Sequence, residues 1–73
     1  MTITYRAYDF DTAGDAIQFA FASGGEAVLV DGKHQVISQK DATRLAAAGV
    51  EFAYLVDREI PDGERRIMTI PVN

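Results

Sequence analysis

Two stretches of the sequence decide the fold: residues 15–31, DAIQFAFASGGEAVLVD, and residues 41–57, DATRLAAAGVEFAYLVD. Aligned without gaps, they carry identical residues at Asp15/Asp41, Ala16/Ala42, Ala20/Ala46, Ala22/Ala48, Ala27/Ala53, Leu29/Leu55, Val30/Val56 and Asp31/Asp57. Composition alone would give about one or two identities over this length. The agreement therefore predicts that one supersecondary unit is used twice in the chain.

The start signal of a helix is repeated together with the helix. Thr12 and Ser38 are hydroxyl residues that lie three positions before Asp15 and Asp41, an arrangement typical of helix N-caps. Apolar segments that favour extended backbone flank each predicted helix. We therefore expect helices at about residues 13–23 and between Ser38 and Gly49, and strands at about residues 2–10, 26–30, 33–37, 50–59 and 64–72.

The two copies are joined by Asp31-Gly32, a strong signal for a two-residue hairpin, because a type I′ turn needs positive φ at both positions. The resulting order, strand-helix-strand-strand-helix-strand, is that of the ferredoxin-like split βαβ fold. Right-handed crossovers then predict an α+β domain with both helices on one face and the sheet order 5-4-1-3-2. We expect residues 1–73 to form a single domain, with pseudo-repeat units at about 8–31 and 34–57 and a C-terminal hairpin strand at 64–72.

The hairpins also assign side chains to the two faces of the sheet. The first turn places Leu29 opposite His34, and a similar turn at residues 62–63 would place Leu55 opposite Ile70. The face expected to meet the helices holds Phe10, Ala27, Leu29, Val36, Ala53, Leu55, Ile70 and Val72.

The other face is expected to be unusually apolar. Two strands contain the runs AVLV and FAYLV, which do not alternate with polar residues and so indicate burial on both sides. A different register or a terminal segment folded over this face would account for the pattern. We favour a second molecule that covers it, because an exposed apolar patch marks an interface and a short chain gains stability from association. The predicted partner interface consists of Val28, Val30, Ile37, Phe52, Tyr54 and Val56.

Length, charge and composition argue against several classes of function. The 73 residues leave room for only a thin core, and no cysteine is present to cross-link it. The net charge of −4 disfavours a phosphate-binding surface. The apolar runs are far shorter than the ~20 residues of a membrane span, and the N-terminus lacks the features of a secretory signal. We expect a soluble cytoplasmic protein that binds neither nucleic acid nor membranes.

No residue pattern predicts catalysis, a metal site or a cofactor. His34 is the only histidine; it could be a general base or a lone metal ligand, but a partly buried strand residue is the simpler interpretation. Ser23 and Ser38 lie outside any nucleophile elbow. Gly24-Gly25 follows a predicted helix, whereas phosphate-binding loops precede one. We therefore expect no enzyme activity.

An RNA-binding sheet is a weaker alternative. Tyr5, Phe52 and Tyr54 could stack bases as in RNA-recognition motifs, which share the ferredoxin-like order of elements. The third strand, GKHQVIS, has no aromatic residue, however, and the acidic charge balance disfavours phosphate contacts.

The sequence thus predicts a small, acidic, non-catalytic module for protein interaction or regulation, which forms a homodimer or binds another protein. The alternative is a sensor domain that binds a small ligand at the boundary of sheet and helices or at the dimer seam. An enzyme ranks third.

Overall fold

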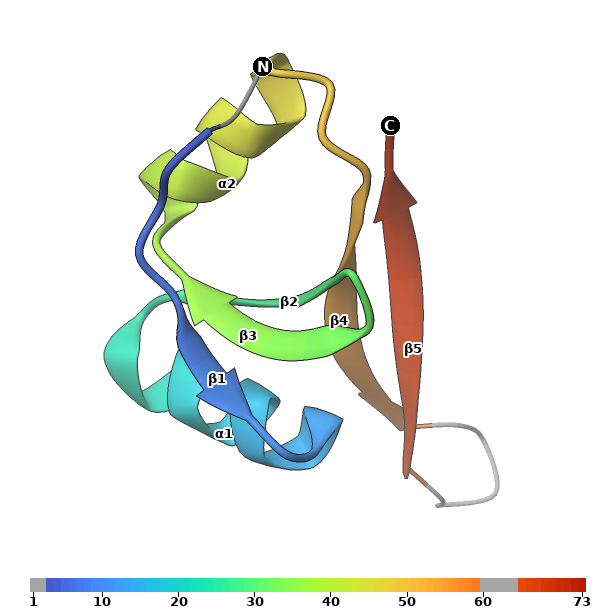
Figure 1. The fold of residues 1–73 in the computed structure, drawn as a ribbon. Coiled ribbons are helices and arrows are strands. Elements are labelled where there is room, and N and C mark those ends of the chain that lie inside the picture. Colours follow the sequence, from blue (N-terminus) through green and yellow to red (C-terminus); the bar gives the residue numbers. More distant parts are fainter. Residues whose placement is uncertain (1–2, 60–64) are drawn as a thin grey trace.

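The described part of the chain folds into two helices and one five-stranded sheet (Figure 1). The computed structural model describes residues 3–59 and 65–73. Its elements are β1 (Tyr8–Phe10), α1 (Ala13–Ser23), β2 (Glu26–Val30), β3 (Lys33–Ile37), α2 (Gln39–Ala47), β4 (Phe52–Glu59) and β5 (Arg65–Val72). Apart from the shorter β1, the elements begin and end close to the predicted positions.

Both helices begin at the predicted N-caps. The hydroxyl oxygen of Thr12 accepts a hydrogen bond from the backbone N–H of Asp15 at 3.1 Å, and that of Ser38 accepts one from Asp41, also at 3.1 Å. Each bond satisfies one of the backbone donors that a helix start leaves without an intrahelical partner. The capping signal in the sequence is therefore confirmed at both helices.

The turn between β2 and β3 is also confirmed. Asp31 has φ 50° and Gly32 has φ 75°, the two positive values that a type I′ turn requires. The turn sets the register, with Leu29 opposite His34 and Val36 opposite Ala27, as predicted. This hairpin forms the centre of the sheet.

The order of the strands differs from the prediction. The sheet runs β1-β3-β2-β4-β5 with every neighbouring pair antiparallel, so the predicted order 5-4-1-3-2 is wrong. β4 pairs with β2 instead of β1, which leaves β1 at one edge and β5 at the other. The ferredoxin-like arrangement, which contains the predicted order, is therefore not confirmed, and the coarser prediction of an antiparallel α+β fold holds.

The two helices pack against opposite faces of the sheet, not against one face as predicted. Ala16 and Ala20 of α1 lie in one buried cluster, which also holds Ala27, Val36 and Leu55. The second buried cluster joins α2 to the other face and consists of Val28, Val30, Ile37, Ala42, Leu45 and Phe52. Because neighbouring strand residues point to opposite faces, these two clusters form two separate cores in a helix-sheet-helix arrangement.

The strand order explains why the helices separate. The first crossover leads from β1 through α1 to β2 and passes β3. The second leads from β3 through α2 to β4 and passes β2, so both crossovers move in the same direction across the sheet. They start from strands that point in opposite directions. Two crossovers of the same right-handed sense then need helices on opposite faces, whereas in the ferredoxin-like order the second crossover returns and both helices share a face.

The pseudo-repeat is not confirmed in the strands. Both units contain a capped helix, but Leu29 and Leu55, which match in the sequence, both pack on the α1 side of the sheet. If the units superposed, Leu55 would face α2, as Leu29 faces α1. The repeated sequence therefore corresponds to repeated helix starts and not to repeated strand orientation.

The register of β4 and β5 also differs from the prediction by one residue. Leu55 lies opposite Thr69, and Tyr54 lies opposite Ile70. A slip of one residue moves each side chain of a strand to the other face, so Ile70 and Val72 lie on the α2 side and not on the predicted α1 side. The predicted turn at residues 62–63 lies outside the described residues.

Truncation of a core leucine tests the two-core arrangement. Leu45 of α2 is fully buried against the sheet and Leu55 of β4 is 7% exposed under α1, so Leu45→Ala and Leu55→Ala should each lower the free energy of unfolding by about 2–5 kcal/mol. Leu29 is only half-buried, and Leu29→Ala should cost clearly less. Urea unfolding measures all three. Equal losses at Leu29 and Leu45 would contradict this division of the core.

Candidate interaction surface

The structure buries most of the predicted partner interface inside the chain itself. Val28, Val30, Ile37 and Phe52 are at most 7% exposed, while Tyr54 and Val56 are half-buried. The first four pack against α2, and Ile3 and Tyr5 add partly buried contacts to the same cluster. The apolar runs correctly indicated burial on both sides, but α2 supplies the cover that was expected from a second molecule. These four residues therefore offer no exposed surface to a partner.

A polar network holds residues 3–5 against the sheet. The hydroxyl of Tyr5 donates a hydrogen bond of 2.9 Å to Oε1 of Gln35, and Nε2 of Gln35 donates one of 2.9 Å to Oδ1 of Asp9. Gln35 is a buried polar residue of the sheet, and this pair of bonds satisfies both ends of its amide. Partial burial, and then the nearby carboxylates Asp31 and Asp9, raise the pKa of Tyr5 above its ordinary value of 10.0.

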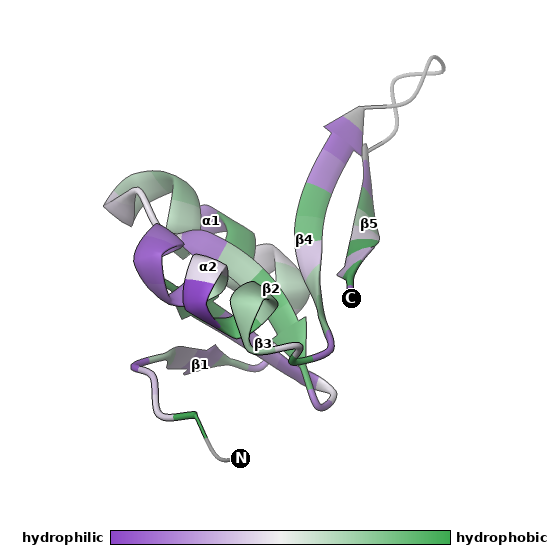
Figure 2. Cartoon of the chain, turned by 90° about the horizontal axis from the view of Figure 1, so that it is seen from above, coloured by the Kyte–Doolittle hydropathy of each residue, from purple (hydrophilic) through white to green (hydrophobic). Residues whose placement is uncertain are grey.

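One exposed apolar surface lies on the arm formed by β4 and β5. Two cross-strand pairs, Tyr54 with Ile70 and Val56 with Met68, continue the α2-side face from the edge of the cluster that α2 covers, against which Tyr54 is partly packed. Met68 is 46% exposed and Ile70 is 54% exposed. Figure 2 shows hydrophobic stretches on both strands of this arm, which stands apart from the helices. We call these four residues the hairpin face.

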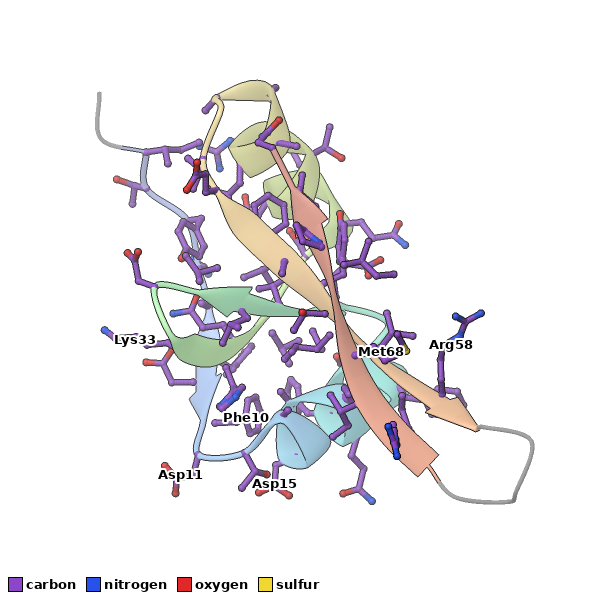
Figure 3. All side chains as sticks on the ribbon, turned by 90° about the vertical axis from the view of Figure 1, so that its right-hand side faces the viewer. Phe10, Asp11, Asp15, Lys33, Arg58 and Met68 are labelled. Carbon is purple, nitrogen blue, oxygen red and sulfur yellow. The ribbon has the colours of Figure 1, made fainter. Side chains whose placement is uncertain are left out.

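Two arginines border the hairpin face. Arg58 and Arg66 lie directly opposite each other, one pair beyond Val56 and Met68 on the same face. In the described part of the chain, neither guanidinium has an ion pair or a hydrogen bond. Arg58 and Met68 project from the same region of the arm (Figure 3). Like charges directly across a strand pair repel each other, so this pair of cations favours a nearby anionic group from outside the arm.

A second exposed apolar feature lies on the α1 side. Phe21 of α1 is 93% exposed and lines a shallow hollow together with Ile17 and Leu55. At the edge of the same side, Phe19 lies between Tyr8 and Phe10, with ring centroids 5.1 and 5.2 Å apart. The aromatic cluster fixes the short strand β1 to α1 and leaves Phe21 as the protruding ring.

The end of α1 and the start of α2 border an open cavity at the surface, with a volume of about 550 Å³. Its lining combines apolar and polar residues, namely Arg6, Tyr8, Phe19, Ser23, Gly24, Gly25, Val36, Ile37, Ser38, Gln39 and Asp41. Gly25 sits where a Cβ would lie 2.9 Å from the carbonyl oxygen of Ile37, so the chain approaches closely at this point. This cavity lies at the boundary of sheet and helices where the alternative sensor function was expected.

His34 and the acidic residues were also considered as ligands of a metal ion. His34 is half-buried in β3 between Leu29 and Phe10. Among the residues that the structure describes, no three histidine, aspartate or glutamate side chains converge on a point where they could hold a metal ion.

The sequence did not predict that one exposed face of the sheet holds Arg58, Arg66, Met68 and Ile70. Ile70 was expected in the core, because the predicted register placed it opposite Leu55. The run RRIMTIP does contain a signal for exposed apolar side chains. It places apolar residues on both sides of a strand that has a neighbour on one edge only.

Comparison of the chain with protein-family models, with curated proteins and with solved structures found no match. No helix in the described ranges, residues 3–59 and 65–73, is long and apolar enough to cross a membrane. The function of the surface must therefore be inferred from its own geometry.

The polar network predicts a pH-dependent contribution of Tyr5. Tyr5→Phe should lower the free energy of unfolding by about 1 kcal/mol at neutral pH, because Gln35 loses a donor. The raised pKa means that the unfolded chain loses the phenol proton first, so the contribution is complete below pH 10 and declines as the pH rises through the raised pKa. Urea unfolding between neutral and alkaline pH measures the difference. Tyr8→Phe, at an exposed ring, is the control, and an equal effect there would contradict the role of the network.

Two glycines give a matched test of the close approach at the cavity. Gly25→Ala should destabilise the chain by about 1–3 kcal/mol, because the new methyl group meets backbone at 2.9 Å. A methyl group at Gly14 would have no neighbour within 4 Å, and Gly14→Ala should stabilise α1 by up to about 1 kcal/mol. Thermal unfolding compares them. A Gly25→Ala variant as stable as the wild type would contradict the close approach of Gly25 to Ile37.

Proposed function

We propose that this chain is a small, non-catalytic protein-interaction module, and that it binds another protein chain through the hairpin face. The observation that carries the proposal is that the hairpin face continues the apolar α2 side of the sheet past the part that α2 covers. The face ends at the cross-strand pair of Arg58 and Arg66. Apolar patches with a polar rim are typical of protein interfaces.

The position of the hairpin face on an edge strand supports this function. β5 has a neighbour on one side only, and its residues from Arg66 to Pro71 are all exposed. Pro71 has no backbone N–H and so weakens the free edge as a template for pairing with another strand. Contact through the side chains of the face is therefore favoured over extension of the sheet.

The alternative function is a small-ligand sensor, favoured by the cavity between α1 and α2. A volume of about 550 Å³ is in the range of small-molecule sites, and Arg6 and Tyr8 provide polar groups at its wall. A thermal-shift screen of small metabolites tests this function: a compound that stabilises the wild type and not Arg6→Ala would support it.

Site-specific photo-crosslinking in the source cell tests the interaction module. A photoreactive phenylalanine analogue at Ile70 should give a covalent product with another protein chain, because Ile70 is the most exposed residue of the hairpin face. The same analogue at Thr69, the neighbouring exposed residue on the opposite face of β5, should give little product. Equal products at both positions, or none at either, would contradict an interface on this face.

A further inference from the structure

We infer that the partner of the hairpin face is an acidic protein segment, which places apolar side chains on the face and a carboxylate between Arg58 and Arg66. This inference rests on the proposed function and names the chemistry of the partner. Arg58 and Arg66 are both exposed and lie directly opposite each other. Side chains at such positions begin only about 5 Å apart, so one carboxylate can accept hydrogen bonds from both guanidinium groups.

The described part of the chain pairs no carboxylate with these two arginines. Because strand side chains alternate between the faces, Asp57 points to the α1 side, where it lines the hollow beside Phe21. Glu26 of β2 lies on the α2 side, two residues before Val28, but it accepts a hydrogen bond of 3.1 Å from Nε2 of Gln39. Among the described residues, the anion that two adjacent cations favour is therefore left to a partner.

The spacing along the arm sets the pattern that the partner must carry. The row runs from Tyr54 to Val56 and Arg58 on β4, at intervals of two residues, and their cross-strand partners repeat it on β5. Each interval covers about 7 Å along the strand. A partner therefore needs two apolar positions in a row and a carboxylate about 7 Å beyond the second. A helix supplies such a row at intervals of four residues, which rise about 6 Å, and an extended segment at intervals of two.

The acidic balance of the chain makes the arginine pair a specific point of attraction. The net charge is −4, and without these two cations it would be −6. An acidic partner is therefore repelled by the chain as a whole and attracted at the end of β4 where the arginines lie, which orients it on the hairpin face. The same balance disfavours an anionic lipid surface as the occupant, because a bilayer would meet the repelling charges over a larger area.

The photo-crosslink at Ile70 tests the acidic partner when it is combined with charge removal. Arg58→Gln and Arg66→Gln should each reduce the product at least about threefold, because each removes a charge-assisted contact. Lys33→Gln removes the same charge on the other side of the molecule (Figure 3) and should change the yield by less than about 1.5-fold. Circular dichroism checks that the three variants keep the wild-type helix content.

Salt separates the charge contact from the apolar contact. In an extract of the source cell, raising the salt from about 50 mM to about 500 mM should reduce the wild-type product, because salt screens exposed charges. The variant that carries both Arg58→Gln and Arg66→Gln should respond much less. Mass spectrometry of the product identifies the partner segment, which should carry aspartate or glutamate within about four residues of the cross-linked residue.

The outcomes distinguish this inference from the proposed function. A product whose yield is the same in the wild type, Arg58→Gln and Arg66→Gln, or whose partner segment has no acidic residue, would overturn the acidic partner and leave the proposed function in place. No product at Ile70 would overturn both. Cosedimentation of the wild type, and not of Arg58→Gln, with vesicles of phosphatidylserine and phosphatidylcholine would also overturn the inference, since it would assign the face to a lipid surface.

Discussion

The antiparallel pairing of β4 with β2 is the constraint on which the rest of the structure depends. It is a short contact, with Val28 opposite Tyr54 and Leu29 opposite Ala53. Because β4 joins the β2 edge, the second crossover continues in the direction of the first, and α2 must cover the face that α1 leaves open. The same pairing uses only the beginning of β4. The remainder, with β5 along its whole length, extends as an arm without a third strand beside it.

Local features of the sequence predicted the elements well because their causes are local. A hydroxyl cap at Ser38 or a positive φ at Gly32 depends on a few neighbouring residues, and the structure has both. The order of the strands depends on which edge of the central hairpin β4 meets. Both orders satisfy the right-handed rule, and the run FAYLV, apolar on both sides, fits either neighbour. The sequence could therefore predict the number and type of the elements, but not which edge of the central β2–β3 hairpin pairs with β4.

The candidate surface shows how the position of β4 in the sheet decides which residues are exposed. With both helices on one face, Val28 and Phe52 would have been exposed and would have needed a partner; with α2 on the other face, they are core residues. The error of one residue in the register of β5 had the opposite effect, since it hid Ile70 in the expected core. The signal of burial on both sides was correct for β2 and for the start of β4, whereas Tyr54 and Val56 are only half-buried. What the sequence lacked was the identity of the segment that covers each side.

The division into two cores links stability to association. Each core holds only five or six buried residues, and α1 and α2 contribute mostly alanine to them. Alanine lets the helices approach the sheet closely but removes little apolar area from water, so each layer is held by a modest free energy. The apolar side chains that could enlarge the α2-side core, Met68 and Ile70, lie on the arm beyond the reach of α2. A chain that packs over the arm would extend this core without any change in the fold of the monomer, and binding would stabilise the folded chain by mass action.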